Sequence, residues 1–268
     1  MNNIIYFMPL LFSFLILQQG NATPIKYGYG NSNGVEIGKT HLLSEDETIL
    51  NYKISENESK NQQVKYNIQV ALLIRQEGSH LLASVLFNNE SRGNYFVHRN
   101  RLALDNNGAD INATSEMCGE SFLITTGNIV LDYSGHKCEF DESSFEYDWV
   151  EIKPRKDVVF NFELGRYYNF LPKNNSYNIG SLEYYVADEK WFTVKKIYKY
   201  FFRIMNIRYE ACDSTSEDVL CKFNPQPEDT IKYFLETFYL NGGREGEYFK
   251  IRTNQMKMNV DGDRIKVG

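Results

Sequence analysis

Residues 64–91 read VKYNIQVALLIRQEGSHLLASVLFNNES and consist of two runs rich in β-branched and large apolar residues. Such runs are typical of strands, so we expect one strand over 64–74 and another over 80–91. The polar segment between them contains Gly78, which favours a tight connection. The stretch therefore predicts a β-hairpin, and it leads us to look for further strands on either side.

Short apolar runs continue at about ten-residue spacing towards the C-terminus, separated by turn residues. In the run 157–164, Val158, Phe160, Phe162 and Leu164 alternate with wetter positions, which predicts a strand with its apolar face inward. The other candidates are 95–97, 101–104, 122–126, 129–133, 149–152 and 182–186. This pattern predicts a mainly β fold, an antiparallel immunoglobulin-like sandwich over residues 63–188.

The rest of the chain has other patterns. Residues 23–62 are rich in Gly, Asn and Ser, and we expect a loose leader there. Residues 189–268 predict a smaller α+β region, because apolar residues recur at helical spacing over 191–205 and 231–239. The aromatic and β-branched residues of the first run also suit a strand, which is the alternative there. Pro227 suits the start of the second helix. Asp261-Gly262, within 257–267, is a two-residue hairpin signal.

The N-terminus has the pattern of an export signal. Residues 4–17 read IIYFMPLLFSFLIL, a run shorter than the roughly 20 residues that span a bilayer, and small residues follow at Gly20 and Ala22. We predict a signal peptide over 1–22 and a periplasmic or secreted protein that begins at Thr23. Because no Lys or Arg precedes the apolar run, an uncleaved anchor is the alternative. No later segment is apolar enough to span a membrane.

The composition of the chain excludes some classes of protein and of partner. The chain has 268 residues, of which 42% are hydrophobic and 15% aromatic, so it can form a sizeable core and is not a disordered or low-complexity chain. Its 29 basic and 35 acidic residues give a formal net charge of −6. An acidic balance argues against nucleic acid as a partner.

The four cysteines are even in number, which suits two disulfides in an exported chain. Three pairings are possible, and we favour the local ones, Cys118 with Cys138 and Cys212 with Cys221. Zinc is the alternative reading, but the C-x-x-C spacing is missing and the four histidines are scattered. We therefore predict no metal and no cofactor.

No sequence motif of a known catalytic site is found. The chain lacks H-E-x-x-H, G-x-S-x-G, the G-x-x-x-x-G-K-[ST] phosphate loop and a complete calcium loop. His98 lies beside Arg99 and close to Arg101, where a general base is conceivable, although a histidine on the surface at a strand end is the favoured reading. We assign no catalytic residue.

The segment 139–149 reads EFDESSFEYDW and mixes five carboxylates with four aromatic rings. It has three readings: a solvated loop, a recognition loop for a basic protein surface or a carbohydrate, and a glycosidase-like carboxylate pair or cation site. The partner-binding candidates are Asp141, Glu142, Glu146 and Tyr147. Trp149 either adds an apolar anchor or, as the first residue of its strand, fills the core.

Several runs resemble the β-sandwich domain that precedes the catalytic domain of deuterolysin-like (aspzincin) metalloendopeptidases. The runs are FLITTG at 122–127, LDYSGH at 131–136, DWVEIKP at 148–154, FNFEL at 160–164, Tyr167 or Tyr168, and YNI at 177–179. The resemblance covers about 70 of the 268 residues. The zinc-binding helix of that family is missing here, so the resemblance implies the fold and brings no catalytic residue with it.

The hypothesis that fits these observations best is an exported, non-catalytic binding protein. Its most concrete version is an inhibitor or immunity-type protein that caps a hydrolase or toxin, with another protein of basic surface as the partner. The alternatives are an exported hydrolase of an unrecognised family and a structural or adhesive surface component. The sequence leaves the oligomeric state open.

Overall fold

The structure is a computed structural model of the 268-residue chain. It describes residues 25–30, 38–43, 56–102, 116–140, 148–210, 227–240 and 245–266. The predicted signal peptide 1–22, the predicted contact residues Asp141, Glu142, Glu146 and Tyr147, and the predicted Cys212–Cys221 pair lie outside the described residues.

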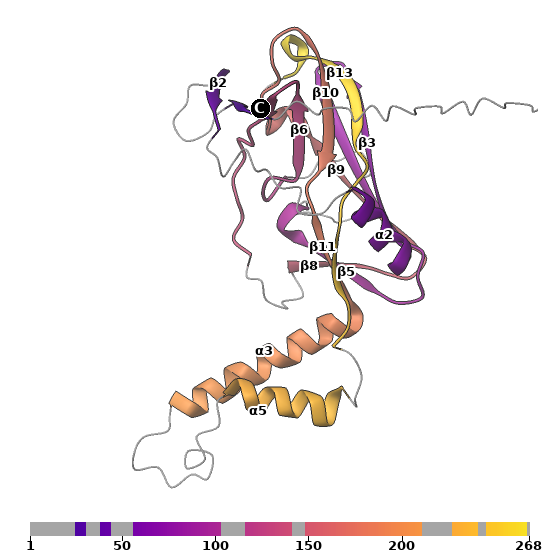
Figure 1. The fold of residues 1–268 in the computed structure, drawn as a ribbon, viewed down its shortest axis with the longest axis vertical. Helices are drawn as coiled ribbons and strands as arrows, with labels where there is room; N and C mark the ends of the chain where they lie inside the picture. Colours follow the sequence, from indigo (N-terminus) through magenta and orange to yellow (C-terminus); the bar gives the residue numbers. More distant parts are fainter. Residues whose placement is uncertain are drawn as a thin grey trace, which may run out of the picture.

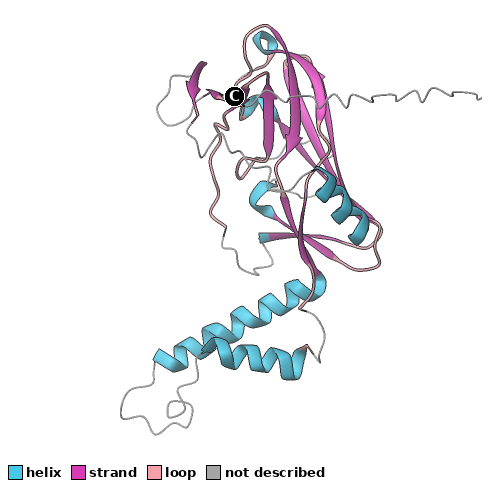
Figure 2. Ribbon diagram, viewed as in Figure 1, coloured by secondary structure: helices cyan, strands magenta, loops and turns pink. Residues whose placement is uncertain are grey.

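The described chain is mainly β, as predicted, with its strands in three sheets (Figures 1 and 2). All strand pairs are antiparallel except the parallel pair of β1 and β7. The strands are β1 (Tyr27–Gly30), β2 (Lys39–Leu42), β3 (Ile68–Glu77), β4 (His80–Asn89), β5 (Tyr95–His98), β6 (Phe122–Thr126), β7 (Ile129–Leu131), β8 (Trp149–Ile152), β9 (Lys156–Glu163), β10 (Asn174–Ser181), β11 (Tyr184–Asp188), β12 (Tyr248–Ile251) and β13 (Met256–Asp261).

The predicted hairpin is confirmed as β3 and β4, which pair over their full length and form a three-stranded sheet with β9. The first strand begins at Ile68, later than residue 64, because helix α2 (Glu56–Tyr66) occupies the preceding residues. Asn67 has φ = 51°, the left-handed conformation that ends many helices, and its backbone then turns into β3.

Two further sheets complete the β region, with strand orders β13-β10-β6-β7-β1-β2 and β12-β11-β5-β8. The predicted boundary between residues 188 and 189 falls between β11 and helix α3 (Glu189–Glu210). Beyond that boundary, β12 pairs with β11 and β13 pairs with β10, so the C-terminal strands return to sheets begun earlier in the chain.

The predicted hairpin at Asp261-Gly262 is wrong. β13 is followed by a 3₁₀ turn over Gly262–Arg264, and the strand pairs with β10. The backbone N–H of Gly262 donates to the Lys173 carbonyl at 3.1 Å. A Cβ on Gly262 would lie 2.0 Å from the carbonyl oxygen of Leu171, so the glycine serves a close approach of two backbone segments rather than a two-residue turn.

One hydrophobic core joins the three sheets. It contains fully buried residues from each of them, such as Phe87 of β4, Val97 of β5 and Ile124 of β6. The inward positions predicted for β9 are confirmed, since Phe160, Phe162 and the following Leu164 are buried, whereas Val159 is 38% exposed.

The range predicted as a leader holds β1, β2 and the first turns of α2. Helix α2 has no apolar stripe, and polar contacts hold it in place together with the stacking of Tyr66 on Phe249 at 3.9 Å. Ser59 Oγ donates to the Arg252 carbonyl at 3.0 Å, and Gln63 Oε1 accepts the Val70 N–H at 2.9 Å. The second contact satisfies a backbone donor of β3, an edge strand of its sheet.

The two predicted C-terminal helices are confirmed as α3 and α5 (Pro227–Phe234), the latter continuing into a π-helical turn over Leu235–Tyr239. They extend from one end of the β region and pack on each other (Figure 1). Their contact has a small core of its own, in which the buried residues are Val194, Ile231, Leu235 and Leu240.

The predicted disulfide between Cys118 and Cys138 is confirmed and closes a loop with a sequence separation of 20. Replacing both cysteines with alanine is expected to lower the free energy of unfolding by about 3 kcal/mol, because the bridge restricts the unfolded chain. Urea unfolding of the wild type and the double variant measures this. A loss below about 1 kcal/mol would contradict the expectation.

Candidate functional site

The outer face of the sheet β12-β11-β5-β8 is rich in aromatic side chains. Its inner face belongs to the main core, where Val97, Val186 and Ile251 are fully buried. Side chains alternate along a strand, so the neighbouring positions point the other way. The register places Tyr248 opposite Ala187, and His98 opposite Trp149, on this outer face.

Three rings form a continuous stack across the outer face. The ring centroids of Tyr185 and Tyr248 are 6.0 Å apart and those of Tyr248 and Trp191 are 4.8 Å apart, both pairs being stacked. Trp191 also contacts Trp149, at 5.6 Å. We call Tyr185, Tyr248 and Trp191 the aromatic row. It joins β11 and β12 to the first turn of α3.

Asp188 positions Trp191 in this row. Its Oδ1 accepts the backbone N–H of Trp191 at 2.7 Å, which is the bond of a helix N-cap, and its Oδ2 accepts the Glu247 N–H at 2.9 Å. The one carboxylate thus fixes both the start of α3 and the segment that leads into β12. Gly246, with φ = 99°, allows the close approach, since a Cβ there would lie 2.1 Å from the Trp191 nitrogen.

Replacing Asp188 with alanine is expected to lower the free energy of unfolding by about 1–2 kcal/mol, because two backbone donors lose their acceptor. We also expect the tryptophan emission to shift to longer wavelength as Trp191 leaves the row. Asp188→Asn, which keeps one acceptor oxygen, is the matched control and should lie between wild type and Asp188→Ala. Equal stability of wild type and Asp188→Ala would show that this cap has no role.

A pocket of about 440 Å³ opens beside the row. Both tryptophans of the chain line it, together with two strand tyrosines and three polar residues. Its volume lies within the range of about 300–1,000 Å³ that is usual for ligand sites. The lining residues are His98, Asn100, Trp149, Tyr185, Trp191, Lys195 and Tyr248.

The polar side of the pocket is formed by the end of β5 and the 3₁₀ turn Arg99–Arg101. His98 Nδ1 accepts the Asn100 backbone N–H at 3.1 Å, so the neutral imidazole carries its hydrogen on Nε2. Asn100 Oδ1 is a buried acceptor with no hydrogen-bond partner among the described residues. A buried acceptor of this kind is a position where a ligand can donate a hydrogen bond.

Cations of the chain lie over the two ends of the aromatic row. Lys250 Nζ is 4.9 Å and Arg101 Cζ 6.0 Å from the ring centre of Tyr185, and Lys195 Nζ is 5.6 Å from that of Trp191. These are cation–π distances. The faces of this row therefore already associate with ammonium and guanidinium groups.

Both described ends of the predicted contact segment 139–149 lie against His98, a residue of the pocket lining. Phe140 and Trp149 contact the His98 ring at centroid distances of 5.6 and 4.9 Å. Trp149 is 5% exposed, so it fills the small core beneath the row, as one of its two readings predicted. The favoured surface reading of His98 is wrong, because the side chain packs between these two rings and is 7% exposed.

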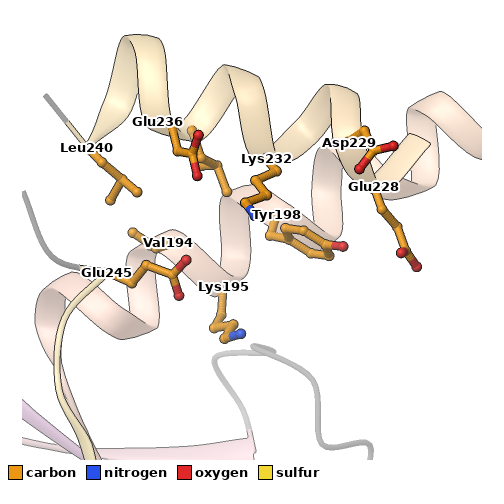
Figure 3. Close-up of a pocket in the computed structure, with 10 residues that line it drawn as sticks. Val194, Lys195, Tyr198, Glu228, Asp229, Lys232, Glu236, Leu240 and Glu245 are labelled. Carbon is orange, nitrogen blue, oxygen red and sulfur yellow. The ribbon is translucent and has the colours of Figure 1, made fainter. Parts of the chain in front are cut away.

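A second hollow of about 260 Å³ lies between α3 and α5 (Figure 3). Its lining combines four carboxylates with two lysines and a few apolar side chains. The residues are Val194, Lys195, Tyr198, Glu228, Asp229, Lys232, Leu235, Glu236, Leu240 and Glu245. The charges of opposite sign are interspersed, and the hollow has no row of aromatic rings, so the larger pocket is the stronger candidate.

Sequence reasoning missed most of the pocket. Tyr185 and Trp191 were expected in a strand and in a helix, with no binding role, and Tyr248 was not singled out. The spacing of these residues along the chain forms no motif. The only available signal was the alternation around Tyr185, which gives β11 a second, less buried face.

Within the part of the chain that the structure describes, no group of three or more His, Cys, Asp or Glu side chains is placed to hold a metal ion. In the same ranges, no helix combines the length and the apolar character needed to cross a membrane.

A comparison with models of known protein families found no match, and a comparison with curated protein sequences found none either. The resemblance to the deuterolysin-like sandwich domain therefore stays a prediction.

Proposed function

We propose that this protein is an exported, non-catalytic binding protein that recognises a basic surface of another protein through the pocket beside the aromatic row. The observation that carries the proposal is the position of the contact segment: its described ends, Phe140 and Trp149, both lie against His98 in the pocket wall. In this proposal, the acidic residues between these ends steer a basic partner towards the aromatic rings of the pocket. Aromatic anchors beside steering charges are typical of protein interfaces.

The fold and the disulfide support the proposal. We propose an antiparallel, immunoglobulin-like sandwich, supported by the main core that strands of all three sheets share. Export is supported by the Cys118–Cys138 bridge, since disulfides persist in oxidising compartments. An inhibitor or immunity-type protein is the most concrete version, because a basic active site is a surface that such an acidic segment would block.

The test begins with capture of a partner from the extracellular fluid or periplasm by the immobilised protein. The association rate of that partner is then measured for the wild type and for the triple variant Asp141→Ser, Glu142→Ser and Glu146→Ser. We expect association to slow by about tenfold or more at low ionic strength, and the difference to shrink as salt is added. Thermal stability should change little, because exposed charges contribute little to it.

An unchanged association rate at low salt would remove the acidic segment from the site. The competing hypothesis, an exported hydrolase, predicts turnover of a substrate by the purified protein. Conversion of any captured molecule at a rate abolished by pocket substitutions would overturn the non-catalytic proposal.

A further inference from the structure

We infer that the pocket beside the aromatic row takes the guanidinium group of an arginine side chain on the partner. This rests on the proposed function and specifies its chemistry. Three observations point to it: cations already associate with the ring faces, one cation at the pocket is replaceable, and a buried acceptor needs a donor.

Cations of the chain itself already lie over ring faces of the row. Lys250 and Arg101 lie over Tyr185, and Lys195 lies over Trp191. A planar guanidinium stacks on tryptophan and tyrosine faces better than a compact ammonium does, because it is flat and weakly hydrated. An arginine that enters this pocket would therefore find the kind of surface that the chain's own cations occupy.

The two ends of the row differ in how firmly their cations are held. At the Tyr185 end, Lys250 pairs with the Glu183 carboxylate at 3.2 Å and Arg101 donates to the Glu183 carbonyl at 2.6 Å. At the other end, Lys195 is exposed and is the one cation of the pocket lining. A partner's arginine would displace Lys195 from Trp191 and leave the Tyr185 end unchanged.

The acceptor on Asn100 distinguishes the ligand classes. Its Oδ1 has no donor among the described residues, so a ligand that donates a hydrogen bond there would satisfy a buried acceptor. Guanidinium presents five N–H donors in a fixed plane, whereas a carboxylate presents none.

Tryptophan emission tests the inference directly, because the chain has two tryptophans and both line the pocket. The full-length protein is titrated with the capped tripeptide acetyl-Gly-Arg-Gly-amide. The comparison ligands are acetyl-Gly-Glu-Gly-amide and methyl glucoside, the latter standing for a carbohydrate ligand. We expect a saturable emission change with the arginine peptide, at concentrations where the other two ligands give none.

Two substitutions test whether the pocket binds a cation and whether Asn100 accepts a hydrogen bond from it. Lys195→Ala removes a competing cation, so it is expected to tighten binding of the arginine peptide at least threefold, whereas it would weaken binding of an anion. Asn100→Leu removes the acceptor and should weaken binding at least fivefold. Tyr233→Ala is the matched control, since Tyr233 is a 65% exposed tyrosine on α5 that does not line the pocket.

Preferential binding of the glutamate peptide or of methyl glucoside would overturn the inference, as would weaker arginine binding by Lys195→Ala. The proposed function can survive that failure. If a pocket substitution abolishes partner binding while the arginine peptide gives no signal, the pocket is the partner's site and only its arginine chemistry is wrong.

Discussion

Replacing Phe87 with alanine is expected to lower the free energy of unfolding by about 3–5 kcal/mol, the usual range for removing a fully buried phenyl ring. Phe87 lies in β4, the central strand of the three-stranded sheet, and is 0% exposed. Its ring meets Phe160 edge to face at 6.0 Å within its own sheet and Tyr184 of the four-stranded sheet at 5.1 Å. The substitution therefore leaves a cavity where two sheets meet.

Equilibrium unfolding in guanidinium chloride measures the loss. Leu73→Ala on the neighbouring strand is the control, because Leu73 is 57% exposed and its truncation should cost well under 1 kcal/mol. A similar small loss for Phe87→Ala would contradict the account of a core shared between the sheets.

The parts of the fold that the sequence predicted are those governed by local patterns. In β3, buried and exposed residues alternate, so Val70, Leu72 and Ile74 identify a strand with one inward face. Helix α3 was predicted for the equivalent reason, since Val194, Ile197 and Phe201 recur at helical spacing and face α5.

The parts that the sequence could not predict depend on contacts distant in the chain. Helix α2 has no apolar stripe, and it is held by contacts with distant residues, such as the hydrogen bond from Ser59 to Arg252, 193 residues away, and the stacking of Tyr66 on Phe249. The pairing of β12 and β13 with strands from earlier in the chain also depends on contacts between distant residues. Asp261-Gly262 suited a local hairpin, but pairing of β13 with β10 determines the structure there.

The candidate site illustrates the same limit. The acidic and aromatic composition drew attention to the segment 139–149, and its two described ends do lie at the pocket. The aromatic row could not be predicted from the sequence, because Tyr185, Trp191 and Tyr248 meet only after β12 pairs with β11 and Asp188 caps α3. No periodicity or motif relates residues brought together in this way.

Tyr248→Ala is expected to weaken partner binding by about 2 kcal/mol or more, roughly 30-fold, as is usual for a central aromatic anchor of an interface. Tyr248 is the middle ring of the row and stacks on both Tyr185 and Trp191. It is 44% exposed, so its loss should affect stability far less than the loss of Phe87.

The most direct test of the account is therefore the affinity of the captured partner for three proteins, the wild type, Tyr248→Ala and Tyr233→Ala, with a melting curve for each. Tyr233 is the control because it is an exposed tyrosine outside the pocket lining. We predict that all three remain folded and that Tyr248→Ala alone loses affinity, by at least about 30-fold. Equal affinity of the wild type and a folded Tyr248→Ala would show that the partner binds elsewhere, and would contradict the assignment of the pocket as the binding site.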